Sequence, residues 1–454
     1  MQDDGSDGRL DVKIRRPLSP QKEGTASSYK VDEREQEIRR LFQKASPPIE
    51  WNPTTFVTIT HLNLPGCGLS SLPSSLATYL PNLSILFCPK NNFQELPEVI
   101  GSCPKLQMVS FKSNGMKRIH PNALQPQLRW LILTDNALES LPTTIGRCHI
   151  LQKLMLSGNC LRMLPEEIGN CKRLELVRLA SNQLLEAPMA LLRLRNLAWA
   201  AFSDNPFLEG FCASDYPQTL PITDHVTEGV LLGQGASGVT RRGVWNGQNV
   251  AVKTYSGSMT SDGNPLHERT LALAASRCNS PCLIQVLGQT SSNGSLVMEL
   301  LENFTAFADP PSMESCTRDV YQQEDSVTAR QAVVMVSGLL DALVKLHECG
   351  ICHGDFYGHN ILTKEEEVRL SDFGAAFFYD RNSNYAHLVE TMEMRAFAHL
   401  VDEIKMLLSR SLEDIATSVG IVLSELANVC REDSYSFSKA QDLWRTKLDA
   451  FVAV

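Results

Sequence analysis

The segment LQKLMLSGNCLRMLPEEIGNCKR (residues 151–173) decides the fold of the first half of the chain, because its pattern recurs on both sides of it. Its first leucine returns every 22 or 23 residues, at Leu83, Leu106, Leu128, Leu151, Leu174 and Leu197. An asparagine follows each of these leucines eight residues later, at Asn91, Asn114, Asn136, Asn159, Asn182 and Asn205. This period is typical of a solenoid in which inward leucines share one stacked core. We expect the asparagine amides to satisfy backbone groups of successive turns.

The quoted segment resembles a leucine-rich repeat of the type that carries Leu-Pro-x-x-Ile-Gly. The resemblance implies six or seven repeats over about residues 55–206, arranged as an α/β solenoid. The first repeat, around Leu62 and Leu64, lacks the asparagine, so we expect it to cap the array. Repeats of this kind bind other molecules and seldom catalyse.

Two positions in each repeat should face the concave side, because side chains alternate along a strand. The first ladder is Ile85, Met108, Trp130, Lys153, Leu176 and Trp199, and the second is Phe87, Ser110, Ile132, Met155, Arg178 and Ala201. A long apolar band on a solvated face suggests a docking surface. We predict that a protein substrate or regulator binds at Trp130, Ile132, Met155 and Trp199. The alternative is that the neighbouring domain or the N-terminal tail of the same chain covers this band.

The chain has 454 residues and 43% hydrophobic composition, which is enough for two or three domains. The polar N-terminal segment has few apolar residues to offset chain entropy, and the repeat pattern ends before a segment that contains two prolines. The predicted organisation is a disordered tail (1–48), a repeat domain (49–212), a linker (213–224) and a second domain (225–454). The alternative for part of the tail is a helix over residues 31–44 through Ile38, Leu41 and Phe42, which its high charge disfavours.

Charge and cysteine content exclude several classes of protein. With 42 basic and 51 acidic residues, the net charge of -9 disfavours a nucleic acid or an anionic membrane as the main partner. No apolar run reaches membrane-spanning length, and residues 1–20 lack the apolar core of a secretory signal. The 13 scattered cysteines form neither a zinc motif nor a secreted disulfide framework. We therefore expect a soluble, cytoplasmic protein.

A glycine-rich stretch opens the second domain. The segment GVLLGQGASGVTRRGVWNGQNVAVKTY (residues 229–255) contains Gly233, Gly235 and Gly238 in Gly-x-Gly-x-x-Gly spacing. Glycine lets a hairpin backbone approach phosphate oxygens without a Cβ clash. The glycines alone also match a dinucleotide-binding fold. The Val-Ala-Val-Lys sequence that ends at Lys253, on a second apolar strand, favours a kinase-like lobe instead.

Two later segments, HGDFYGHNIL (353–362) and VRLSDFGAA (368–376), complete a resemblance to the protein kinases that covers about residues 226–430. The resemblance implies a two-lobed α+β fold that binds ATP and Mg²⁺. Asp355 matches the aspartate that orients and deprotonates the attacking hydroxyl, and Asn360 and Asp372 match the Mg²⁺ ligands. Carboxylate and amide oxygens suit Mg²⁺.

The same resemblance assigns further residues to the nucleotide. Lys253 matches the lysine that holds the α- and β-phosphates, and Glu268 is the candidate for its ion-pair partner. The alternative for Glu268 is an ordinary surface acid. Along the adenine side, the resemblance implies a binding residue, a gatekeeper and a two-residue hinge: Ala251, Met298, Glu299 and Leu300.

The chain also departs from the kinase pattern. Gly354 replaces the arginine that commonly pairs with a phosphorylated activation loop, so we expect activity that does not depend on such phosphorylation. Tyr357 replaces a lysine near the γ-phosphate, which removes one cation. The segment after Asp372 is short and lacks Ala-Pro-Glu, and Glu393 falls where the family has an aspartate. These features predict a reduced substrate platform and a truncated C-lobe.

The favoured function is an ATP- and Mg²⁺-dependent protein kinase, directed at serine or threonine, whose repeats serve as a protein-docking module. Two alternatives stay open at this point: a pseudokinase scaffold that binds without turnover, and a small-molecule phosphotransferase, whose His-Gly-Asp motif is similar to residues 353–355. Four residues are retained together and favour catalysis: Lys253, Asp355, Asn360 and Asp372.

Overall fold

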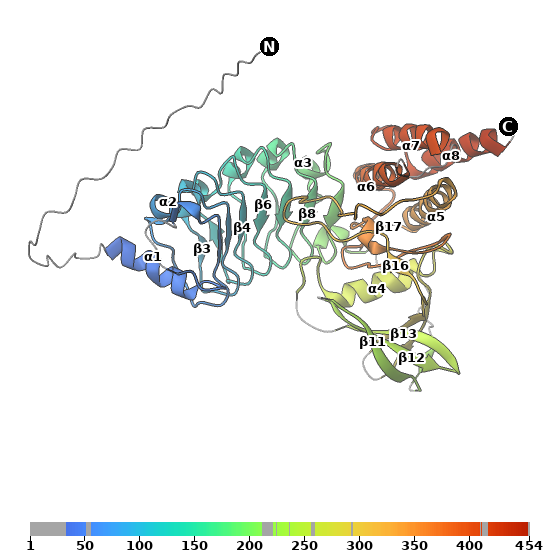
Figure 1. Cartoon of the computed structure of the whole chain (residues 1–454), viewed down its shortest axis with the longest axis horizontal. Coiled ribbons are helices and arrows are strands. Elements are labelled where there is room, and N and C mark those ends of the chain that lie inside the picture. Colours follow the sequence, from blue (N-terminus) through green and yellow to red (C-terminus); the bar gives the residue numbers. More distant parts are fainter. Residues whose placement is uncertain are drawn as a thin grey trace, which may run out of the picture.

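The computed structural model describes residues 33–50, 56–210, 221–223, 225–235, 237–255, 259–291, 294–408, 410 and 416–452. Figure 1 shows a curved array of repeats whose C-terminal end abuts a second, two-lobed domain. The predicted multidomain organisation, a repeat solenoid followed by an α+β domain, is confirmed. None of the helices in the described ranges is both long enough and apolar enough to cross a membrane.

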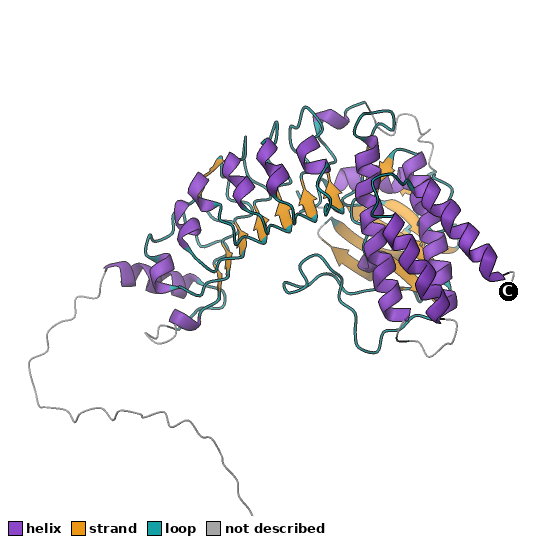
Figure 2. Cartoon of the chain, turned by 90° about the horizontal axis from the view of Figure 1, so that it is seen from above, coloured by secondary structure: helices purple, strands orange, loops and turns teal. Residues whose placement is uncertain are grey.

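The repeats contribute one strand each to a parallel sheet. Its strands in spatial order are β1 (His61–Asn63), β2 (Ile85–Phe87), β4 (Met108–Ser110), β6 (Trp130–Ile132), β7 (Lys153–Met155), β8 (Leu176–Arg178) and β9 (Trp199–Ala201). Short helical turns form the opposite side of the array (Figure 2): α2 (Leu76–Tyr79), η2 (Glu98–Ser102), η3 (Pro121–Ala123), η4 (Thr143–Arg147), η5 (Glu166–Asn170) and α3 (Met189–Leu192). The strand register pairs the predicted ladder positions with one another from repeat to repeat.

The asparagine ladder ties successive repeats together. Asn182 is typical: its Nδ2 donates to the carbonyls of Leu156 (3.0 Å) and Leu179 (2.9 Å), and its Oδ1 accepts from the amide of Leu161 (3.1 Å). Each amide thereby satisfies backbone groups of two repeats, as the sequence predicted.

A helix covers the N-terminal end of the array. Helix α1 (Glu33–Lys44) buries Ile38, Leu41 and Phe42 in the repeat core. The predicted disorder is therefore wrong for residues 33–48, because the first repeat would otherwise expose its apolar core and α1 offers an apolar face to cover it. Residues 1–32 lie outside the described residues.

The small lobe of the C-terminal domain is a sheet with one long helix. The strand order is β10 (Ile222–Thr223), β14 (Val286–Thr290), β15 (Leu296–Glu299), β13 (Gln248–Tyr255), β12 (Gly238–Trp245) and β11 (Thr227–Gly235). Helix α4 (Pro265–Ala275) begins at Asn264, whose side chain accepts from the amide of Leu266. Strand β10 lies within the predicted linker, but it pairs with β14, so the domain begins earlier than predicted.

The large lobe is mostly helical. Its long helices are α5 (Ala329–Glu348), α6 (Ala386–Leu408), α7 (Ala416–Val429) and α8 (Phe437–Val452). Its short strands are β16 (Thr305–Ala306), β17 (Ile351–Cys352), β18 (Ile361–Lys364), β19 (Glu367–Leu370) and β20 (Phe377–Phe378), with the turn η8 (Gly358–Asn360) before β18. The truncation of this lobe stays a prediction.

The last repeats pack directly on the large lobe. The apolar core of the repeats continues into residues of that lobe such as Phe377, whose ring lies edge-on to Phe202 at a centroid distance of 5.4 Å. Trp199 is 1% exposed and stacks on Tyr357 at 4.3 Å. The prediction that Trp199 binds another protein is therefore wrong, because the same chain already covers it. Intramolecular cover, the alternative, holds at this end of the concave face.

Candidate active site

A cavity of about 410 Å³ lies between the two lobes, where the adenine and sugar of a nucleotide were expected. Seven predicted residues line it: Ala251, Lys253, Glu268, Met298, Glu299, Leu300 and Asp372. Sequence reasoning missed the apolar side chains that complete its walls, such as Leu232, Val286 and Leu362. Ordinary strand leucines and valines give no sequence pattern that distinguishes a cavity wall from a core.

A second cavity of about 290 Å³ adjoins Lys253 and lies under the β11–β12 hairpin. The three predicted glycines line it, and Asp262, which the sequence did not single out, lies opposite them. A Cβ at Gly238 would collide with the backbone carbonyl of Thr254, whereas a Cβ at Gly233 or Gly235 would meet no protein atom within 4 Å. Of these three positions, packing within the described residues requires glycine only at Gly238. The absence of a side chain at Gly233 and Gly235 leaves the cavity open along the hairpin.

The predicted ion pair between Lys253 on β13 and Glu268 on α4 is formed. The Glu268 side chain is buried, so the alternative of an ordinary surface acid is wrong. Burial raises the pKa of Glu268, and the ammonium of Lys253 opposes that effect. The pair fixes the lysine ammonium at the junction of the two cavities, both of which Lys253 lines.

The loop after β17 brings Asp355 and Asn360 together. Nδ2 of Asn360 donates to the backbone carbonyl of Asp355 at 2.9 Å and to its Oδ2 at 3.0 Å. Asp372 follows β19 with a φ of +57° and accepts from the amide of Gly374 at 3.1 Å. Nε2 of His353 donates to the carbonyl of Ser371 at 2.9 Å, which links the two loops.

Glu393 on α6 holds the backbone of the same loop, the segment that follows β17. Its carboxylate accepts from the backbone amides of His353 (3.1 Å) and Gly354 (2.6 Å), and it lies 2.8 Å from Nε2 of His347. Burial would raise the pKa of Glu393, but the contacts with His347 and the Gly354 amide bring it below its ordinary value. Glu393, at the position where the kinase resemblance implies an aspartate, thus holds the backbone of this loop at His353 and Gly354.

One residue of the repeat domain lies in this site. Arg178 forms an ion pair with Asp355, donates from Nε to Asp262 (2.6 Å) and from Nη1 to the carbonyl of Gly354 (3.3 Å). Burial alone would raise the pKa of Asp355, but the guanidinium of Arg178 holds it below its usual range. The sequence placed Arg178 on the concave ladder and gave no indication of its partner.

The repeat domain also accounts for the glycine at Gly354. This residue has a φ of +73°, and its carbonyl accepts from the amide of Ala200 on β9 at 3.0 Å. A Cβ at this position would overlap the carbonyl of Ala200 and lie 2.8 Å from that of Ala375. An arginine here, as in the kinase pattern, is incompatible with the packed repeat strand.

The chain resembles known families in both of its parts. The description "Leucine rich repeat" matches residues 126–184, and "Protein kinase domain" matches residues 226–446. The chain carries a leucine-rich-repeat region followed by a protein kinase domain. A protein kinase domain is a phosphotransferase domain, so the coarse prediction of the enzyme class is supported.

Several curated proteins are similar to parts of the chain. Cell division control protein 7 of Schizosaccharomyces pombe is 31% identical over 158 residues, which cover 33% of this chain and 14% of that protein. Leucine-rich repeat-containing G-protein coupled receptor 5 of Rattus norvegicus is 31% identical over 136 residues, 24% of this chain and 15% of that protein. A probable myosin light chain kinase of Dictyostelium discoideum is 25% identical over 168 residues, 35% of this chain and 40% of that protein. The chain thus spans less than half the length of each of them.

Among solved structures, an LRR protein of Leptospira interrogans is 31% identical, with a TM-score of 0.32 and coverage of 34% of this chain and 40% of that one.

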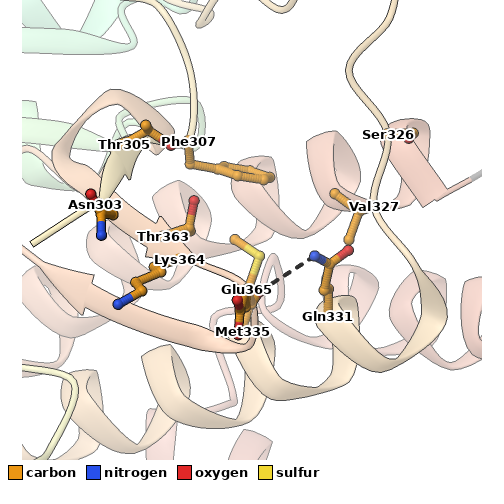
Figure 3. A pocket seen from close by; sticks show the side chains of 10 residues that line it. All are labelled: Asn303, Thr305, Phe307, Ser326, Val327, Gln331, Met335, Thr363, Lys364 and Glu365. Atoms are coloured by element: carbon orange, nitrogen blue, oxygen red, sulfur yellow. Dashed lines mark hydrogen bonds between the residues drawn. The ribbon is translucent and has the colours of Figure 1, made fainter.

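A further hollow of the kinase domain lies outside this site. A cavity of about 470 Å³ lies between α5, the β18–β19 hairpin and the segment around β16. Figure 3 shows the side chains that line it. Nε2 of Gln331 donates across one side of it to the carbonyl of Glu365 at 3.3 Å. None of the predicted site residues lines this cavity, so it is separate from the nucleotide cleft.

Proposed function

We propose that the chain is an ATP- and Mg²⁺-dependent protein kinase that phosphorylates serine or threonine. One observation carries the proposal: the Lys253–Glu268 ion pair is closed at the junction of two cavities. A domain that only holds partners has no need of a lysine that an ion pair with a buried glutamate fixes beside a cavity under a glycine hairpin. Kinases require this pair in place for turnover.

Asp372 and Asn360 supply the kinds of oxygen that fit a nucleotide with Mg²⁺, and of the two only Asp372 lines the cavities of the cleft. Asp372 lines both cavities, and Asn360 lies beside Asp355, so carboxylate and amide oxygens, the donors that Mg²⁺ prefers, come from adjacent loops. A bound Mg²⁺ would neutralise phosphate charge. In this proposal Asp372 and Asn360 hold the ion, and Lys253 holds the α- and β-phosphates.

Asp355 acts on the acceptor hydroxyl. Its side chain is 16% exposed, so an acceptor can reach it. The amide of Asn360 fixes one carboxylate oxygen at 3.0 Å, which sets the orientation of the group before substrate binds. Asp355 then orients the hydroxyl and accepts its proton as the oxygen attacks the γ-phosphate.

Two substitutions test the proposal. Asp355→Asn should keep the shift in melting temperature that ATP with Mg²⁺ produces relative to the unliganded variant, because Asp355 lines neither cavity of the cleft. It should lose transfer of radiolabelled phosphate to protein acceptors, because the amide accepts no proton from the acceptor hydroxyl. Asp372→Asn should lose both, because it removes a charged ligand. Full transfer by either variant would overturn the proposal. Label found on tyrosine, or only on small molecules, would reject the serine/threonine assignment.

The uncovered part of the concave face is proposed to dock the protein acceptor or a regulator. Trp130, Ile132 and Met155 are only partly buried, and they lie two or three strands away from Trp199, which the kinase domain covers. We also propose a reducing, cytoplasmic location, because the 13 cysteines are scattered along the sequence without a disulfide framework.

A further inference from the structure

We propose that Arg178 of the repeat domain is a positioning residue of the kinase active site, where it replaces the lysine that the kinase pattern has at Tyr357. The inference rests on the proposed function, because it assigns Arg178 a role in the reaction of Asp355. The active site would then be composite: the nucleotide cleft belongs to the kinase domain, and one cation belongs to β8 of the repeats.

The contacts of Arg178 fix its guanidinium in one place. Nη2 pairs with Oδ1 of Asp355, Nε with Asp262 at 2.6 Å, and Nη1 reaches the carbonyl of Gly354 at 3.3 Å. The side chain is 4% exposed. Arginine presents its donors in a rigid planar fork, so three partners on different sides leave the group no alternative orientation.

Both departures from the kinase pattern in this loop are matched by contacts with the repeat domain. Tyr357, where the pattern has lysine, stacks on Trp199, and the Nε1 of Trp199 donates to the carbonyl of Phe356 at 3.0 Å. Gly354, where the pattern has arginine, leaves the space that Ala200 of β9 occupies. Compared with the kinase pattern, the loop thus has no cation at Gly354 or Tyr357, where the repeat domain packs. Arg178 of the repeat domain supplies one cation in their place.

The interface has the character of a permanent one. Apolar residues of the last repeats, Leu176 and Trp199 among them, belong to the same buried cluster as the helices of the large lobe. Domains joined by a large apolar interface do not separate readily, whereas domains that move relative to each other usually have smaller and more polar interfaces. The guanidinium of Arg178 is part of this interface, so we expect it to stay at Asp355 throughout the reaction rather than to leave when the domains move.

Arg178 leaves Asp355 able to accept a substrate hydroxyl. Arg178 donates to Oδ1 and Asn360 to Oδ2. A carboxylate offers about four lone-pair sites, so two donors on separate oxygens do not exhaust it. The opposite hypothesis, in which Arg178 blocks Asp355 and inhibits the enzyme, predicts that removing the arginine raises activity. The two hypotheses therefore differ in the sign of the effect.

The test compares steady-state kinetics of the full chain with Arg178→Ala, Arg178→Lys and a control, Arg395→Ala. Arg395 on α6 also crosses the domain boundary, where it donates to the carbonyls of Leu194 (3.1 Å) and Leu197 (3.2 Å), but it does not contact Asp355. We expect Arg178→Ala to lower kcat at least about 100-fold, as loss of one preorganised charge does, while KM for ATP changes less than about 3-fold. Arg178→Lys, or millimolar guanidinium added to the alanine variant, should restore part of kcat, and Arg395→Ala should keep it.

Two outcomes of the kcat comparison overturn the inference. A kcat of Arg178→Ala equal to that of the wild type would make the arginine structural, and a higher kcat would make it an inhibitory clamp. If the alanine variant does not fold, Arg178→Gln, which keeps most of the volume and loses the charge, replaces it, and the same kcat comparison decides. Absence of phosphate transfer by the wild-type chain is a different result, because it rejects the proposed function itself.

Discussion

The two ends of the concave repeat face have the same backbone geometry and different surroundings. At Trp130 the indole is partly exposed and touches its neighbours in the array: Nζ of Lys153 lies 4.5 Å above the ring, and Nε1 is 3.4 Å from the sulfur of Met155. At Trp199, three strands on, the ring is buried between Tyr357 and His399 of the kinase domain. Equivalent positions of one repeat pattern therefore serve as open surface at one end and as domain interface at the other.

The repeat pattern therefore determines the direction of a side chain but not its contacts. What covers Trp199 is decided by Gly354 and Tyr357, about 150 residues further along the chain, because the two replace the larger or charged residues that would keep a repeat strand away. If this is right, changes at the covered end should cost much more stability than equivalent changes at the open end.

The largest effect is expected for Trp199→Ala. The substitution removes a stacked ring and the hydrogen bond to Phe356, and it leaves a cavity in the interface. The free energy of unfolding of the full chain should fall by about 3–5 kcal/mol, measured by urea denaturation. Trp199→Phe keeps an aromatic ring in the interface, so its free energy of unfolding should fall by less than that of the alanine variant. An unchanged midpoint for the alanine variant would mean that the two domains do not pack in this way.

The next largest effect is expected for Gly354→Ala. A methyl group there would overlap the carbonyl of Ala200, and the backbone has a φ of +73°, which disfavours any side chain. The expected loss is about 2–4 kcal/mol, measured in the same way. Gly420→Ala is the matched control, because a Cβ at that position on α7 would meet no atom within 4 Å and alanine favours a helix. Equal effects of the two variants would contradict the predicted interface.

These contrasts show how much the sequence could predict. The ladder register and the asparagine contacts follow from a local period, and the cleft residues follow from motifs whose spacing is tied to one chemistry, so both were predictable residue by residue. The pairing of Arg178 with Asp355 was not, since the two are 177 residues apart and nothing periodic joins them. For residues 33–44 the sequence offered a helix through Ile38, Leu41 and Phe42 only as the alternative to disorder, because a short, highly charged helix is stable only when the first repeat covers its apolar face.

The asparagine ladder should show no difference between the two ends. Asn114, at the open end, donates to the carbonyls of Cys88 (3.0 Å) and Phe111 (3.0 Å), much as Asn182 does at the covered end. Alanine at either position leaves buried backbone groups unpaired, so each variant should lose about 2 kcal/mol of unfolding free energy. Asn196→Ala, which affects one exposed bond to the carbonyl of Lys172, is the control and should change little. A much larger loss at Asn182 than at Asn114 would show that the kinase domain, and not the ladder, stabilises the covered repeats.

The smallest effect on stability is expected for Trp130→Ala, and this variant tests what the open end does. The ring is partly exposed, and its contact with the ammonium of Lys153 is of a kind that contributes about 1 kcal/mol or less, so unfolding of the full chain should hardly change. If the open end docks the acceptor, KM for a folded protein acceptor should rise several-fold, because large aromatic side chains often supply the anchor of an interface. KM for a short peptide around the phosphorylated residue should stay the same, since such a peptide is too small to occupy both the cleft and the repeat face. Equal KM values for wild type and variant with the folded acceptor would exclude Trp130 as a docking residue, whereas a rise with both acceptors would place its effect in the catalytic cleft.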